Sequence, residues 1–309
     1  MINGFKKEMM FFTRGGRLLA VILVTLSLAV MSPVMFGMMQ GMIEMLAAAA
    51  PSEEYMEMMS MFTSFSASDI TMYNVEYVAG IGAIVVLFVF KGAAGGEQKL
   101  RSVVIPQCSG LSAVNYVLPK YLIYPPFIFA MSALSIYAGA GASLIFFEGP
   151  LDWGYVTVAA LCTGVFLAFS TAVQLCVGIC TGKSGLAIIL CIAMQTFLPS
   201  ILSTFRVDRF NPFALYSIAL SAAMASGESG NSLMTAVEAA STSNDLTTLN
   251  IAVSAGTAVV ISVLLYFVTL FVLNATATHF AAGSLPYRTP LPYEKKARMP
   301  PPDAPAILR

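Results

Sequence analysis

Long runs without a single charged residue are the feature that most constrains this chain. The first extends from Leu18 to Ile43, and others cover residues 121–147, 153–182 and 184–205. About 20 apolar residues are what an α-helix needs to cross the hydrocarbon core of a bilayer. The chain is 58% hydrophobic and 10% charged, whereas soluble domains carry about 25% charged residues. An all-α integral membrane protein is therefore predicted.

Two further apolar runs complete a predicted bundle of six transmembrane helices. The second span is short between Glu76 and Lys91, so we extend it on both sides and expect Lys91 to reach the lipid head groups. The sixth span is densest over residues 251–273. The predicted spans cover about 18–40, 73–94, 121–147, 154–180, 185–205 and 250–273.

The distribution of charge predicts that both termini are cytoplasmic. With the N-terminus inside, 14 of the 16 basic residues fall in inner segments, and only Arg206 and Arg209 fall outside. Of the 16 acidic residues, 12 fall outside. Basic residues are enriched in cytoplasmic loops, and a wrong number of spans would have mixed the two sides. The agreement favours six spans.

Three segments lie outside this set of spans. Residues 1–17 mix aromatic and methionine side chains with lysine and arginine, which is typical of an amphipathic helix on the inner surface, and Gly15-Gly16 makes an elbow after it. Residues 210–227 are uncharged but begin with Asn-Pro, and we expect a re-entrant or interfacial outer helix there rather than a seventh span. One transmembrane domain over 1–285 and a flexible cytoplasmic tail over 286–309, rich in proline and basic residues, complete the predicted organisation.

The chain shows no energy source of its own. No ionisable residue lies at the centre of a predicted span, whereas ion-coupled transporters use buried carboxylates or histidines. The segment GICTGKSG resembles a phosphate-binding loop, but that motif has four residues between its first glycine and the Gly-Lys pair. Here three residues separate Gly178 from Gly182, and the segment follows an apolar span. We expect a tight inner turn, with no catalytic group or ATPase motif in this chain.

Sulfur-containing residues are numerous but do not predict a metal site. The cysteine spacing matches no zinc pattern, and the cysteines are expected to be small buried hydrophobes. A methionine-rich stripe can bind soft metals, but it is more commonly an adaptable apolar face. The cysteines are Cys108, Cys162, Cys176, Cys180 and Cys191, and the methionines of the first outer loop are Met42, Met45, Met56, Met58, Met59 and Met61.

The order of these elements resembles a known family. It is an inner amphipathic helix, a span, an outer loop, a span, a larger inner loop, two spans, a short inner turn, a span, a long outer segment with a partial helix, and a last span. The larger inner loop and the start of the third span read GGEQKLRSVVIPQCSGLSAVNYVLPKYLIYPPF. Over residues 1–285 this layout is similar to the permease subunits of type-2 ABC exporters, the bacterial relatives of the ABCG-like (type V) transporters.

The resemblance implies a coupling site in the larger inner loop. In the family this loop carries a glutamate near its start, then a hydrophobic helix, a proline, and a lysine that opens the third span. It docks on a separate subunit that holds ATP and Mg. Gln98-Lys99 departs from the Gly-Thr that is common in the family. The implied coupling residues are Glu97, Gln98, Lys99, Arg101, Pro106 and Lys120.

The resemblance also implies a dimeric path. Two six-helix protomers, identical or different, would enclose it, with the second and fifth spans nearest its axis. The expected partners are an ATP-binding cassette subunit, a second permease protomer and the lipid bilayer of a bacterial plasma membrane. The formal net charge of zero provides no basic field for nucleic acid. The residues placed near the path are Gln195, Thr196, Phe197 and Pro199.

Other classes stay open from the residues alone. A non-transporting scaffold or sensory partner would need no ATPase subunit, so co-purification separates it from an exporter. A channel, a secondary carrier or a membrane enzyme would show ion flux or lipid turnover in liposomes without ATP.

Overall fold

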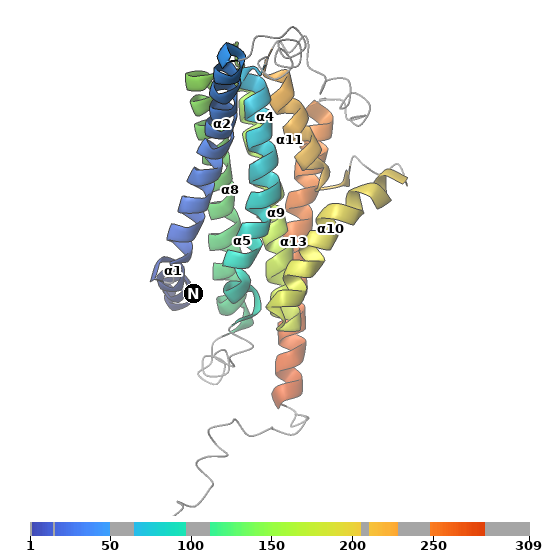
Figure 1. Ribbon diagram of the computed structural model, residues 1–309. Helices are drawn as coiled ribbons and strands as arrows, with labels where there is room; N and C mark the ends of the chain where they lie inside the picture. The colour runs from blue at the N-terminus through green and yellow to red at the C-terminus, as the bar shows by residue number, and fades with distance from the viewer. Residues whose placement is uncertain are drawn as a thin grey trace, which may run out of the picture. The chain divides into compact units, whose positions relative to one another are not determined.

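The protein is a multi-pass helical membrane protein, in a computed structural model that describes residues 2–14, 16–49, 65–96, 112–204, 210–227 and 248–281. Every regular element in these ranges is a helix (Figure 1). Six helical segments are long and apolar enough to cross a membrane, as the charge-free runs predicted. They are Arg17–Met42, Ala67–Val89, Ala113–Phe146, Trp153–Thr181, Ser184–Leu202 and Leu249–Ala275.

The chain divides into two units, residues 1–270 and 271–309, and the arrangement given below is that of the first. The helices are α1 (Ile2–Arg14), α2 (Arg17–Ala49), α4 (Ala67–Tyr77), α5 (Ala83–Val89), α8 (Ala113–Phe146), α9 (Trp153–Thr181), α10 (Ser184–Thr204), α11 (Ala214–Ala225) and α13 (Thr248–Ala281), with π-helical turns η1 (Val78–Gly82) and η2 (Gly92–Gly96). Of the second unit, the structure describes the end of α13.

Two helices begin earlier than the sequence predicted. The helix of the second span starts at Ala67 instead of about residue 73, and that of the third starts at Ala113 instead of 121. The predicted starts followed from Glu76 and Lys120, the charged residues that border the apolar runs, but Glu76 lies within α4 and Lys120 within α8. Asp69, earlier in the chain, belongs to the cap of α4. The Asp69 carboxylate accepts from the Ser66 backbone N–H at 3.0 Å while the Ser66 hydroxyl accepts from the Asp69 N–H at 3.3 Å, the reciprocal cap that stabilises a helix start.

α9 is the central helix of the bundle. In its best apolar stretch 72% of the residues are buried, against 17% for α10 and for α13. α9 packs against α8, α10 and α11. Gly164 allows the close approach of α8, because a Cβ at this position would lie 2.7 Å from the Phe129 ring. An apolar helix that lacks protein neighbours on one side is suited to contact lipid or a second subunit.

The second span is interrupted rather than uniform. η1 separates α4 from α5, and α5 ends at Val89, shortly before η2. The amide of Gln174 on α9 donates to the backbone carbonyl of Leu87 near this end. A polar side chain in the fourth span thus donates a hydrogen bond to a backbone carbonyl of the second span, close to the point where the regular helix of that span ends.

α11 is too short to be a seventh span. Its 12 residues give a length of about 18 Å, whereas the hydrocarbon core is about 30 Å thick. α11 packs between α4 and α9, and Phe213 at its start meets the rings of Phe166 and Phe169. Its far end is fixed by the Asp152 N–H, which donates to the Ser226 carbonyl at 2.7 Å.

Glycines make the two tight connections that the sequence predicted. Gly16 has φ +71° between α1 and α2, and Gly182 has φ +65° where α9 ends. Glycine adopts this left-handed conformation without steric cost. The Gly182 N–H donates to the Gly178 carbonyl at 2.9 Å, a common way of closing a helix C-terminus. The segment GICTGKSG is therefore a turn between two helices.

Candidate functional site

A buried ion pair joins α1 to α8. The Lys120 ammonium lies 2.8 Å from Glu8 Oε1, and the two side chains are 0% and 3% exposed. The Tyr124 hydroxyl donates to Glu8 Oε2 at 3.2 Å, and the ammonium lies 4.9 Å from the centre of the Tyr116 ring. A charge is retained in such a place only when it is paired and hydrogen-bonded. Here the Glu8 carboxylate neutralises the Lys120 ammonium, and it accepts hydrogen bonds from both the ammonium and the Tyr124 hydroxyl.

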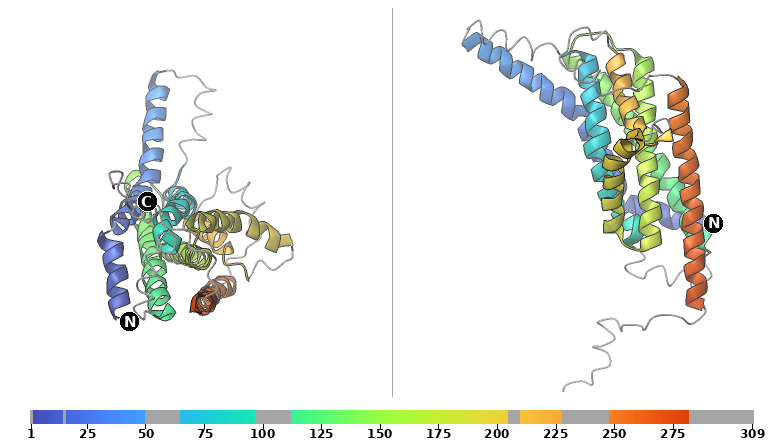
Figure 2. Two further views of the ribbon diagram at one scale, coloured as in Figure 1. Left: turned by 90° about the horizontal axis from the view of Figure 1, so that it is seen from below. Right: turned by 90° about the vertical axis from the view of Figure 1, so that its right-hand side faces the viewer.

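The spacing of four residues on α1 creates this contact. Gly4, Glu8 and Phe12 lie on one face of the helix, and all three face α8. A Cβ at position 4 would lie 2.5 Å from the Asn115 carbonyl oxygen, so only glycine permits this approach. Phe12 packs against Tyr124 and against Phe90, with ring centres 5.5 Å and 6.3 Å apart. α1 consequently runs beside the first turns of α8 (Figure 2).

Arg17 connects this cluster to the second span. Its guanidinium lies over the Phe11 ring at 4.0 Å and donates to the Tyr124 hydroxyl at 3.5 Å. A Cβ on Gly92, the first residue of η2, would collide with the same guanidinium. The start of α2 is therefore packed against η2.

The last turn before the predicted coupling loop rests on the α9–α10 connection. A Cβ on Gly95 would lie 2.8 Å from the Gly178 carbonyl oxygen and 3.2 Å from the Ser184 nitrogen. Both of those atoms are backbone atoms, which move only with their helices. On the far side of the loop, the Ser112 hydroxyl caps the start of α8 by accepting from the Asn115 N–H at 3.3 Å. Both ends of the segment 97–111 are thus held by packed helices.

The predicted coupling residues divide into two groups. Glu97, Gln98, Lys99, Arg101 and Pro106 lie outside the described residues. Lys120 was expected to open the third span, but it lies seven residues after the first residue of α8 and is bound to Glu8. Its described contacts are those of a link between α1 and α8.

The predicted path residues lie on different faces of α10. The Gln195 amide donates to the Ser170 hydroxyl of α9 at 2.9 Å, so this side chain faces the bundle. Phe197 is 64% exposed, and the Thr196 hydroxyl bonds only the carbonyl one turn earlier in the described contacts. Pro199 lies inside the helix, where a proline bends the axis. Thr196 and Phe197 are the pair that faces away from α9.

Sequence reasoning missed Glu8, Tyr124 and Gln174. A signal for Glu8 was present, because it is the only acidic residue before Glu44 and lies four residues from both Gly4 and Phe12. Its partner lies 112 positions away, which no local pattern could identify. Among the described residues no group of three His, Cys, Asp or Glu side chains gathers in a way that could hold a metal ion.

Comparison with known proteins gives no assignment for this arrangement. No family model matches the chain, no curated protein matches it, and no solved structure matches its fold.

Proposed function

We propose that this chain is the membrane-spanning permease subunit of an ATP-binding-cassette exporter, driven by a separate ATPase subunit. The observation that carries the proposal is the convergence of α1, α2, η2, α8 and the α9–α10 turn around the two ends of the segment 97–111. The resemblance of the element order to type-2 exporters supports the same reading. A bundle of this kind needs a partner to supply energy for transport.

The proposal assigns a mechanical role to the contacts at this end. A partner that pushes on the segment 97–111 would displace η2 and, through it, the rest of the second span. It would also displace the first turns of α8, and the Glu8–Lys120 pair would transmit that displacement to α1. Packed interiors transmit strain because they have few voids. The ion pair, Arg17 and Gly95 are accordingly positioning groups for coupling.

The proposed orientation places these contacts on the cytoplasmic side of a bacterial plasma membrane. Both termini are then inside, α1 lies along the inner surface, and α11 enters from the outer surface. This arrangement agrees with the 14 of 16 basic residues that fall on the inner side.

The translocation path is proposed to lie between two protomers. A cavity between α2, the second span, α8 and α9 has a volume of about 10 Å³ and an apolar lining that includes Val24, Leu28, Val86 and Leu167. That is about the size of one water, too small for a transported molecule. Exposed apolar side chains on the second span and on α10, among them Phe88, Ile189 and Phe197, are where the second protomer is expected to pack.

Replacement of the loop residues tests the proposal. Affinity purification in mild detergent should recover an ATPase subunit in stoichiometric amount, and Glu97→Ala or Pro106→Ala should abolish ATP-driven transport without lowering expression. Glu148→Ala is the matched control, because Glu148 is exposed at the opposite end of α8. Full transport in the loop variants would contradict the coupling assignment, and purification without any ATPase would contradict the exporter class.

A further inference from the structure

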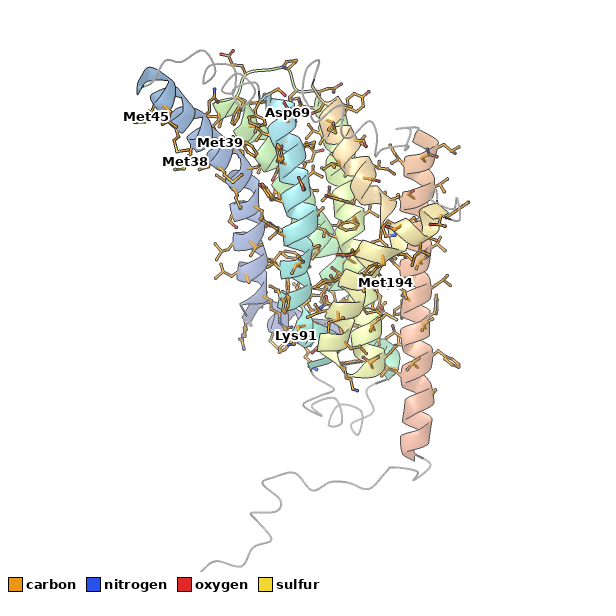
Figure 3. All side chains as sticks on the ribbon, turned by 45° about the vertical axis from the view of Figure 1, so that its right-hand side comes forward. Met38, Met39, Met45, Asp69, Lys91 and Met194 are labelled. Atoms are coloured by element: carbon orange, nitrogen blue, oxygen red, sulfur yellow. The ribbon has the colours of Figure 1, made fainter. Side chains whose placement is uncertain are left out.

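Two thiols of α9 lie side by side near the end of this helix. Cys176 and Cys180 are four residues apart, which places them on one face, one turn from each other, and their side chains are direct neighbours. Cys176 is buried and Cys180 is half-buried. Figure 3 shows the turn from α9 to α10 at the same end of the bundle as Lys91. The pair therefore lies close to the aqueous phase at that end.

Hydroxyl groups from two other helices adjoin the pair. The Thr269 hydroxyl of α13 is a neighbour of both thiols, and the Tyr121 hydroxyl of α8 is a neighbour of Cys176. The two hydroxyl oxygens lie 3.2 Å apart. The Tyr121 hydroxyl also donates to the Ala172 carbonyl at 3.3 Å. Side chains of three helices thus meet at the two sulfurs.

The spacing of the two thiols suits a shared ion better than a disulfide. Residues four apart on a helix have Cβ atoms about 5–6 Å apart, whereas a disulfide requires about 3.5–4.5 Å. A metal–thiolate bond is about 2.3 Å long, so two sulfurs on opposite sides of one ion are about 4.6 Å apart. Small rotations about χ1 bring neighbouring sulfurs to that separation, and the helix stays wound.

We propose that Cys176 and Cys180 bind one soft monovalent cation of the Cu(I) class as a pair of thiolate ligands. Thiolates select Cu(I), zinc and iron–sulfur clusters, whereas Mg²⁺, Ca²⁺ and Mn²⁺ prefer oxygen. Zinc takes three or four protein ligands, and an iron–sulfur cluster takes four. Within the described ranges no third Cys, His, Asp or Glu side chain joins the pair. Cu(I) is the ion among these that two thiolates suffice to hold.

Binding exchanges protons for the ion. Both thiols lose their protons to solvent, two sulfur–metal bonds form, and no electron is transferred. The product carries one negative charge, and a hydrogen bond to a charged group stabilises it. The Tyr121 hydroxyl supplies that bond when it turns from the Ala172 carbonyl to the Cys176 sulfur. The site is independent of the proposed export function.

Competition for Cu(I) in two matched variants tests the site. Cys108→Ala/Cys162→Ala/Cys191→Ala keeps the pair, and Cys108→Ala/Cys176→Ala/Cys180→Ala keeps two thiols that lie apart. Cys191 contacts the Ser170 carbonyl, and Ser170 lies about 12 Å along α9 from Cys162. Each variant is reconstituted in lipid nanodiscs and titrated anaerobically with Cu(I) against the chromophoric chelator bathocuproine disulfonate. The first should take one Cu(I) per chain from the chelator, and the second should take none.

Loss of one sulfur should remove the site. Cys176→Ser or Cys180→Ser, added to the variant that keeps the pair, should weaken Cu(I) affinity by more than the roughly 10–100-fold that loss of a supporting partner costs, because a ligand itself is removed. Phenylarsine oxide checks the geometry without substitution at either position, since its arsenic forms two As–S bonds with neighbouring thiols and releases one water. Intact mass should show one adduct that resists a monothiol in the variant that keeps the pair, and none in the control.

Two outcomes of the Cu(I) titration would overturn the proposal. The first is equal retention of Cu(I) by the two matched variants, and the second is an unchanged affinity after loss of either cysteine. Absence of the arsenic adduct would contradict the adjacency of the thiols on which the site depends. An arsenic adduct without Cu(I) binding would show that the thiols are adjacent but hold no ion.

Discussion

Removal of one member of the Glu8–Lys120 pair is the change whose effect the structure determines most closely. At a separation of 2.8 Å two unit charges attract by about 6 kcal/mol at an effective dielectric constant of about 20. Most of that attraction offsets the cost of burying both charges. Lys120→Met leaves a buried carboxylate without its ammonium partner, and Glu8→Met leaves a buried ammonium without its carboxylate partner. Each single variant should lose about 3–5 kcal/mol of stability.

The double variant should behave differently from either single one. Glu8→Met/Lys120→Met removes both charges and fills the space with apolar atoms, a replacement that is often neutral or stabilising by about 1–4 kcal/mol. The Tyr124 hydroxyl keeps the Arg17 guanidinium as a partner. The double variant should therefore be close to the unchanged protein, and the two substitutions should be strongly non-additive.

Unfolding in mixed detergent micelles measures this cycle. Trp153 is the only tryptophan, so its fluorescence reports unfolding without a competing signal. Lys183→Met is the matched control, because Lys183 is exposed and surface substitutions usually change stability by less than about 0.5 kcal/mol. Additive losses, or single variants that cost less than about 1 kcal/mol, would refute the buried pair.

Three further predictions use the same assay. Gly95→Ala should lower the free energy of unfolding by about 1–3 kcal/mol through overpacking and weaken transport. Gly185→Ala is the control, because a Cβ there meets nothing within 4 Å, and its stability should be unchanged or slightly higher. Equal effects of the two substitutions would contradict the close contact at Gly95. Gln174→Leu should cost at most about 1.7 kcal/mol, since the lost bond is partly offset by removal of a side-chain oxygen that has no described partner, and a larger loss would indicate contacts other than these. Gln195→Leu breaks the bond to Ser170 and should cost about 0.6 kcal/mol and speed hydrogen exchange in α10; unchanged exchange would show that the bond does not restrain the helix.

The spans could be predicted because the bilayer imposes a composition on them. A helix that meets lipid must be apolar for about 20 residues, and this leaves a local signal in the charge-free runs. The starts of α4 and α8 could not be predicted in the same way. A rule that ends spans at charges places boundaries at Glu76 and Lys120. The helix of the second span nevertheless begins nine residues before Glu76, at a cap that includes Asp69, and Lys120 is paired with Glu8 inside α8.

The candidate site was harder to predict because its contacts are long-range. Glu8 and Lys120 are 112 positions apart. The close contact that requires a glycine at position 95 is with the backbone of Gly178, more than 80 residues later. The sequence pointed to the loop after the second span through its resemblance to a family. The contacts of the helices that hold the ends of that loop are tertiary, and they leave no local pattern in the sequence.

Photo-crosslinking from the loop tests the central claim most directly. A photoreactive amino acid is placed at Gln98 or, as the control, at Leu151 in the turn between α8 and α9 at the opposite end of the bundle, and cells are irradiated before membranes are purified. The account predicts that position 98 captures an ATP-binding cassette subunit and position 151 does not. Capture of that subunit from position 151, or no protein adduct from position 98, would contradict it.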